Sequence, residues 1–128
     1  MKTLTTKNIK VSVVTRYEPG HSFPSQGKYV HAYWIKIENL SNSPVQLLSR
    51  EWIIKDSNLI DRHIKGDGVI GKQPIIESGA FHEYSSWCPI VTNIGQMSGK
   101  YRMKRLMDGS IFDVNIPAFA LIHPPKLN

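Results

Sequence analysis

Hydrophobic and polar residues alternate with a period of two through most of this chain. Near the N-terminus, the apolar residues Ile9, Val11 and Val13 are separated by polar ones. Residues 33–38 repeat the pattern, with one face formed by Tyr33, Ile35 and Ile37 and the other by Trp34, Lys36 and Glu38. Successive side chains of a β-strand point to opposite faces of its sheet, so this pattern predicts strands with one buried face.

No long stretch shows the 3.6-residue period of an amphipathic helix, and prolines and glycines recur at short intervals. Short strands separated by turn residues are typical of all-β domains. We therefore predict an all-β sandwich of about seven to eight short antiparallel strands. A length of 128 residues predicts that residues 1–128 form a single domain with one core.

Local signals predict several connections. Residues 45–56 carry apolar side chains on both faces, which predicts a central strand, and residues 57–58, Ser-Asn, predict a turn after it. The Asp-Gly pair at 108–109 predicts a two-residue hairpin before the last strand. Pro117 lies late in that strand and favours a sheet edge or a bend. The longest loop is expected at residues 17–29.

Composition and charge restrict the setting and the partners. The N-terminus has no apolar run typical of a signal peptide, and we find no transmembrane segment, so we expect a cytoplasmic protein without membrane insertion. A single cysteine, Cys88, excludes an internal disulfide and is compatible with a reducing compartment. The net charge of +6 favours anionic partners such as nucleic acids, phosphates or acidic proteins.

The segment GDGVIG, residues 66–71, has the glycine spacing of a dinucleotide-binding turn. Such a turn needs a helix behind it, whose N-terminus holds the pyrophosphate. Pro74 and Gly79 leave room for no more than a turn, so we exclude the dinucleotide fold. No Gly-Lys-Ser/Thr follows either, which excludes a P-loop.

Two interpretations of the glycines remain. In the first, they only give the backbone the conformations that a tight loop needs. In the second, successive amides form a nest that binds a small anion such as pyrophosphate. Asp67 would repel a phosphate there, whereas flanking lysines would attract it. The candidate anion-binding residues are Lys65, Gly66, Gly68, Gly71 and Lys72.

Other reactive residues predict no catalytic or metal site. Asp61 and His63 would share a strand face, but no third ligand follows at a recognisable spacing, so we predict no metal site. Cys88 is interpreted as a small buried residue. The serines at 85 and 86 lie outside any nucleophile elbow. We therefore predict a protein that is not an enzyme and has no cofactor.

Two further groups of residues have structural interpretations. The basic run KYRMKR, residues 100–105, is interpreted as a solvated strand face that resists aggregation. Its only aromatic residue points to the opposite face, so nucleic-acid binding is not expected. The three tryptophans, Trp34, Trp52 and Trp87, are predicted to pack in or beside the core.

Five segments occur in an order that resembles the ApaG family, also called CorD: VQLLSREWII, GDGVIGKQPIIESG, EYSS, TNIGQMSGKYRM and FDVNIPAF. The similarity extends over nearly the whole chain. It implies an immunoglobulin-like or fibronectin-III-like β-sandwich in a small bacterial protein, genetically linked to cobalt resistance and magnesium efflux. Related domains at the ends of F-box proteins and of a polymerase-delta-interacting protein resemble protein-binding modules. The resemblance implies no catalytic residues.

These observations lead to three functional hypotheses. The first is a non-enzymatic module that binds a protein partner through the loops at 17–29 and 66–74 and affects cation homeostasis indirectly. The alternative is a sensor of pyrophosphate or a nucleotide at the glycine loop, residues 66–71. The third is direct metal binding at Asp61 and His63. Exposed strand edges are compatible with a dimer, and the sequence leaves the oligomeric state open.

Overall fold

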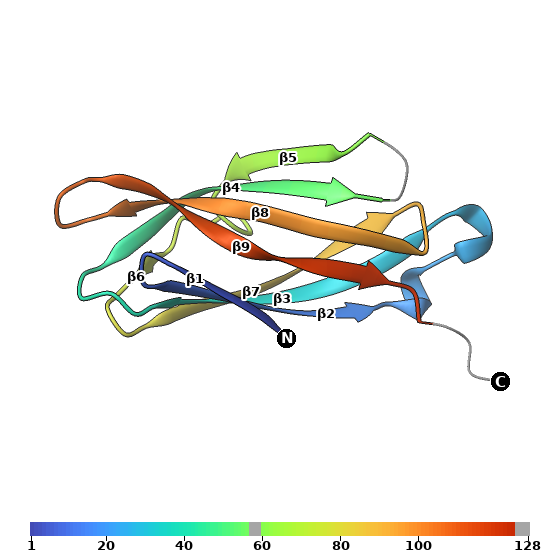
Figure 1. Cartoon of the computed structure of the whole chain (residues 1–128), viewed down its shortest axis with the longest axis horizontal. Coiled ribbons are helices and arrows are strands. Elements are labelled where there is room, and N and C mark those ends of the chain that lie inside the picture. Colours follow the sequence, from blue (N-terminus) through green and yellow to red (C-terminus); the bar gives the residue numbers. More distant parts are fainter. Residues whose placement is uncertain (57–59, 125–128) are drawn as a thin grey trace.

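The chain forms two antiparallel β-sheets packed face to face, as a computed structural model of residues 1–56 and 60–124 shows (Figure 1). The predicted all-β sandwich is confirmed. Sheet 1 contains, in spatial order, β1 (Lys2–Thr6), β2 (Ile9–Tyr17), β3 (Tyr29–Asn39) and β7 (Phe81–Ile90). Sheet 2 contains β5 (Arg62–Asp67), β4 (Val45–Lys55), β8 (Ile94–Arg105) and β9 (Ile111–Ile122), with β6 (Ile75–Ile76) also paired to β4.

The described residues form nine strands, slightly more than the sequence pattern predicts. One addition is β6, which is too short to show any alternation. The other is β1, which forms a tight hairpin with β2. Lys7 and Asn8 occupy its two central positions, with φ angles of 49° and 65°. Positive φ at both central residues matches the twist of a two-residue hairpin, and asparagine adopts this conformation readily.

The predicted central strand is confirmed, because β4 pairs with β5 and β6 on one side and with β8 on the other. The turn predicted at residues 57–58 lies outside the described residues. The β8–β9 hairpin is also confirmed, but its loop is longer than predicted. The amide of Arg105 donates to the Ser110 carbonyl, so the loop covers residues 106–109.

Pro117 lies in β9, which is an edge strand of sheet 2, as the proline predicts. The pairing of β8 with β9 shifts register between Met97 and Gly99, so that two residues of β9 oppose one of β8. Pro117 is one of those two residues. A bulge at an edge accommodates the missing amide hydrogen of proline without breaking the sheet.

The core lies between the two sheets. Its apolar side chains alternate along the strands with outward polar ones, as the sequence pattern predicts for β2 and β3. At its centre Trp52, Tyr33 and Phe119 form an aromatic cluster with ring centroids 5.5–5.9 Å apart. No helix in the described part of the chain is long and apolar enough to cross a membrane.

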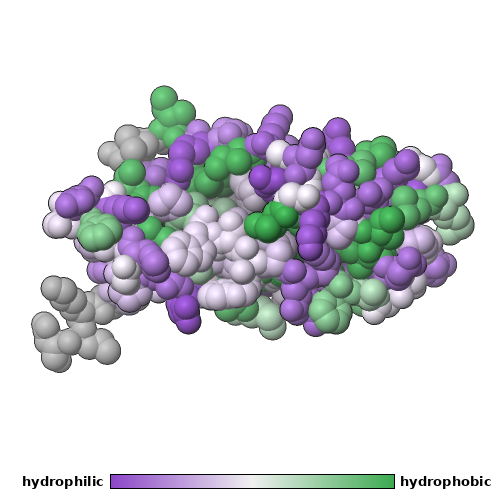
Figure 2. Space-filling view, turned by 180° about the vertical axis from the view of Figure 1, so that it is seen from behind, coloured by the Kyte–Doolittle hydropathy of each residue, from purple (hydrophilic) through white to green (hydrophobic). Residues whose placement is uncertain are grey.

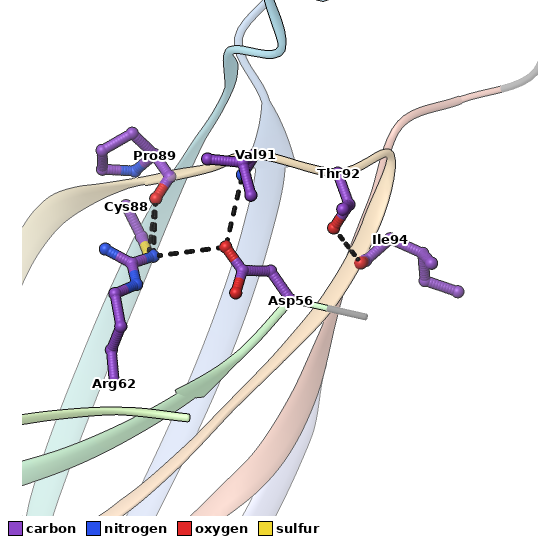
Figure 3. Close-up of polar contacts among 7 residues, drawn as sticks. All are labelled: Asp56, Arg62, Cys88, Pro89, Val91, Thr92 and Ile94. Atoms are coloured by element: carbon purple, nitrogen blue, oxygen red, sulfur yellow. Dashed lines mark hydrogen bonds and ion pairs between the residues drawn. The ribbon is translucent and has the colours of Figure 1, made fainter. Parts of the chain in front are cut away.

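The two long sides of the sandwich differ. On one side β1 approaches β9, and the amide of Asn115 donates to the hydroxyl of Thr6. On the other side β5 and β7 are both sheet edges, and β7 lies at the back of the view in Figure 1. An arginine bridges these two edges, because Nη2 of Arg62 donates to the Pro89 carbonyl over 2.8 Å (Figure 3).

The connection from β2 to β3 contains two short 3-10 turns, Pro19–His21 and Pro24–Gln26. Ser22 anchors it to the sandwich: its hydroxyl donates to the Glu18 carbonyl and accepts from the Val30 amide. This anchoring places the loop against sheet 1, where the ring of His21 packs on Trp87.

Candidate functional site

The segment GDGVIG belongs to a hairpin and not to a strand–helix turn. Its first two residues complete β5. Val69 and Lys72 then exchange amide-to-carbonyl hydrogen bonds of 2.8 and 3.0 Å across a tight turn. The central residues of that turn, Ile70 and Gly71, have φ angles of 48° and 71°, as in a type I′ hairpin. The next element is β6, so the exclusion of a dinucleotide fold is confirmed.

Each glycine of the segment has its own structural reason. A Cβ atom on Gly68 would lie 2.0 Å from the Lys72 carbonyl oxygen, and its φ is +59°. Gly71 occupies a turn position with φ of +71° in open space. Gly66 has ordinary backbone geometry, but a Cβ there would lie 2.8–2.9 Å from the guanidinium of Arg50. The glycines therefore allow close packing within the hairpin and against one arginine.

The five candidate anion-binding residues do not line one common cavity. Lys65 and Gly66 line an open charged depression of about 300 Å³ on the outer face of sheet 2, together with Glu51. Gly68, Gly71 and Lys72 are not among its lining residues. The amides of Gly68 and Lys72 donate within the chain, to Leu48 and Val69. Anion binding by the whole set stays a prediction.

A second cavity, the edge slot, opens between the free edges of β5 and β7. It measures about 200 Å³. Its polar lining comes from Tyr33, Arg50, Arg62, Ser86 and Cys88, and its apolar lining from Trp52, Ile54, Ile64 and Met97, among others. These residues come from five strands and lie far apart in the sequence.

A β-bulge aims Arg50 into this slot. The pairing of β4 with β8 shifts register between Leu47 and Ser49. Before the bulge Leu47 is buried, and after it Trp52 is buried, so the inward-facing positions change from odd to even numbers. Arg50 therefore lies on the inward face of β4 with Trp52, although the strand pattern before the bulge would direct it to solvent.

Electrostatics in the slot are dominated by cations. Nη1 of Arg50 donates to the carbonyls of Asp67 and Gly68, over 3.0 and 2.9 Å. No ion pair among the described residues includes Arg50. Arg62 lies 3.9 Å from the carboxylate of the buried Asp56, which in turn accepts from the Val91 amide (Figure 3).

The tyrosines and the cysteine of the interior are held neutral. Burial raises the pKa of Tyr33, an effect that a hydrogen bond with Ser86 and the charge of Arg50 partly oppose. Burial also raises the pKa of the Cys88 thiol to about 11, in spite of the nearby Arg62 guanidinium. The interpretation of Cys88 as a buried residue is confirmed. A thiol with this pKa is a poor nucleophile near neutral pH.

The proposed metal ligands Asp61 and His63 do not form a metal cluster. Asp61 lies 3.7 Å from the ammonium group of Lys55. No group of three or more histidine, cysteine or acidic side chains arranged to hold a metal ion occurs within residues 1–56 and 60–124.

Two of the four cations in the basic run at residues 100–105 form ion pairs with carboxylates on neighbouring strands. Lys100 lies 3.8 Å from Glu51 and 3.4 Å from Asp113, and Arg102 lies 3.6 Å from Asp113. These paired side chains are 43% and 59% exposed, in agreement with the interpretation as a solvated strand face.

The tryptophan prediction holds for only one of the three residues. Trp52 is buried in the core, but Trp34 is 41% and Trp87 is 52% exposed on the outer face of sheet 1. The alternation in β3 carries the signal that was missed, because Trp34 shares its face with Lys36 and Glu38.

These tryptophans belong to a larger surface, which we call the aromatic face: Val14, Phe23, Trp34, Phe81 and Trp87. Phe23 and Phe81 are 52% and 56% exposed. Cations cover several of the rings: Arg16 lies over Trp34 and Lys36 over Phe81, at 5.4 and 4.4 Å from the centroids. Figure 2, which views the molecule from behind, shows apolar patches directly beside hydrophilic ones.

An open cavity of about 610 Å³ adjoins Trp34 and Val14 on this face. Its rim carries both signs of charge: Lys10, Lys36, Glu38 and Glu83. Glu38 lies within 3.9 Å of both lysines. The face therefore combines exposed aromatic rings with balanced charges.

Comparisons with known proteins agree with this fold. The family model described as the ApaG domain matches residues 19–105. Protein ApaG of Maricaulis maris is 45% identical over 116 residues, covering 91% of this chain and 88% of the relative. Protein ApaG of Pseudomonas aeruginosa is 43% identical over 124 residues, covering 97% and 98%. The crystal structure of an ApaA protein from Bordetella pertussis superposes with a TM-score of 0.87 at 42% identity, covering 92% of this chain and 95% of that one.

Proposed function

Because this chain belongs to the ApaG family, we propose that it is a non-enzymatic module that binds a protein partner through the aromatic face. One observation carries this proposal. Trp34, Trp87 and Phe81 stay 41–56% exposed on the outer face of one sheet, although a neighbouring side chain lies against each ring. Water-exposed aromatic patches of this kind mark interaction surfaces in soluble proteins.

The composition of the face favours a protein partner over a nucleic acid. Tryptophan and arginine are enriched among the residues that contribute most to protein–protein binding, and Arg16 stacks on Trp34 here. A platform for single-stranded nucleic acid needs uncompensated cations beside its rings. Glu38 lies close to Lys10 and Lys36, and would repel phosphates.

The loop at residues 17–29 extends this surface, which supports our proposal that this loop contributes to the contact. His21 packs on Trp87, and Phe23 is exposed beside it. The glycine hairpin at residues 66–74 lies at the other sheet and forms a separate candidate contact. We propose further that the protein acts in the cytoplasm and that its link to cobalt and magnesium is indirect, through the partner.

Site-specific photo-crosslinking tests this proposal. A photoreactive phenylalanine analogue replaces Trp34 in one variant and Met107 in a control, since Met107 is 70% exposed in the β8–β9 loop. In intact cells of the source organism, we expect a discrete protein adduct from position 34 and none from position 107. Excess unlabelled protein should abolish the adduct, and excess Trp34→Ala protein should not. Adducts removed by nuclease, or equal adducts from both positions, would contradict the proposal.

A further inference from the structure

The edge slot contains a guanidinium, that of Arg50, which forms no ion pair within the described residues, although it also borders the outer depression lined by Glu51, Asp67 and Asp113. Arg50 lies on the inward face of β4, where the bulge places it. An ion pair with Arg50 would need a carboxylate, and no carboxylate of the described residues forms an ion pair with Arg50. A partly buried cation without a counter-ion is costly, because burial removes much of its hydration.

The protein nevertheless holds this guanidinium in one position. Nη1 is occupied by the carbonyls of Asp67 and Gly68, and the flat group lies against Gly66. These contacts fix its orientation, and within the described residues neither Nε nor Nη2 of Arg50 donates a hydrogen bond. The edge formed by Nε and Nη2 presents two parallel N–H donors, which match the two oxygens of a carboxylate.

The rest of the lining is suited to an anion that carries an apolar group. Arg62, which is already paired with Asp56, supplies a second guanidinium, and Tyr33 and Ser86 supply neutral hydroxyls. The apolar lining includes Trp52, Ile64 and Met97, which lie on the same sheet as both arginines. A volume of about 200 Å³ corresponds to roughly seven water-sized groups at about 30 Å³ each.

We propose that the edge slot is a binding site for a carboxylate attached to a small apolar group, with Arg50 as the carboxylate anchor. Such a group occurs in a free branched-chain acid and in the C-terminal residue of a peptide. The site adjoins the aromatic face at Trp87, which lines the slot, but its anchor Arg50 lies on the other sheet, and the proposal does not depend on the protein-binding function. The site is distinct from the glycine-loop amides, because the anchor is a side chain.

NMR titration of the methyl groups of Ile54, Ile64 and Met97 tests the proposal, since all three line the slot. The first probe is 3-methylbutanoate, compared with neutral 3-methylbutanamide. The second is the peptide acetyl-Gly-Gly-Leu with a free C-terminus, compared with its C-terminal amide. We expect saturable shifts with the carboxylates and binding about 10- to 100-fold weaker with the amides. Tighter binding of the peptide identifies a protein C-terminus as the source, and tighter binding of the free acid identifies a small metabolite.

Variants separate the slot from general charge effects. Arg50→Met should abolish the shifts, whereas Arg102→Met, which removes the same charge from the outer face of sheet 2, should leave them unchanged. Ile64 is 41% exposed at the mouth, so Ile64→Trp should fill the slot and abolish binding without touching either arginine. Equal binding of acid and amide, unchanged binding in Arg50→Met, or stronger shifts with inorganic pyrophosphate than with 3-methylbutanoate would overturn the proposal.

Discussion

Substituting the glycines of the GDGVIG segment one at a time should produce a graded loss of stability. Gly71→Ala places a side chain on a left-handed backbone conformation, which costs about 1–2 kcal/mol. The space around Gly71 is open, so the added methyl group meets no steric clash. Gly68→Ala has the same backbone cost, and its Cβ would also lie 2.0 Å from the Lys72 carbonyl oxygen. Relief of that clash separates Val69 from Lys72 and removes two hydrogen bonds of about 1 kcal/mol each.

The expected loss of unfolding free energy is therefore about 3–4 kcal/mol for Gly68→Ala and about 1–2 kcal/mol for Gly71→Ala. Gly66→Ala should cost about 1 kcal/mol, because the arginine side chain that it meets can move. Urea unfolding, followed by the fluorescence of the buried Trp52, measures all three without any ligand. A Gly68→Ala loss no greater than that of Gly71→Ala would refute the hairpin account of the segment.

Three further results are expected. Burial and the nearby His123 lower the pKa of His31, and burial and Lys72 lower that of His82. Both histidines then bind protons more readily in the unfolded chain than in the folded one. The stability that the neutral histidines contribute should therefore be fully present above pH 6.5 and fall as the pH drops below that value. Urea unfolding measured at a series of pH values should show a smaller fall for His31→Phe than for the wild type. Tyr101→Phe should lower the unfolding free energy by about 1–3 kcal/mol, because it leaves the buried Tyr84 hydroxyl without its hydrogen-bond partner. In a double-mutant cycle, the variant with phenylalanine at both positions should lose less than the sum of the two single losses. Cys88, with a pKa of about 11, should react with a disulfide reagent at pH 8 much more slowly than an unperturbed thiol, so labelling of the native protein as fast as of the unfolded chain would contradict its burial.

The strand pattern predicts the sandwich because each sheet buries one face, and a period of two is then visible in the sequence. It also places Trp34 correctly, on the side of Lys36 and away from Ile35. The hairpin at 66–72 is foreseeable in part, since Pro74 rules out a helix. The β1–β2 hairpin is not, because Lys7-Asn8 lacks the glycine that usually marks such turns.

The edge slot could not be predicted, for two physical reasons. The bulge between Leu47 and Ser49 reverses which residues of β4 face inward, and no residue type there marks it. The slot also depends on the pairing of β5 with β4 and of β7 with β3, which brings Arg62 opposite Ile54 and Ser86 opposite Tyr33. Contacts between residues far apart in the sequence cannot be read from the sequence pattern, whereas the alternation within one strand can.

The central claim is that Trp34 and its neighbours form the surface to which a protein partner binds. The most direct test is the dissociation constant between this chain and the partner captured from position 34, measured for the wild type, for Trp34→Ala and for the control Met107→Ala. We expect Trp34→Ala to weaken binding by at least about tenfold, as for an exposed aromatic anchor, while Met107→Ala leaves it unchanged. Equal dissociation constants for Trp34→Ala and the wild type would contradict the account.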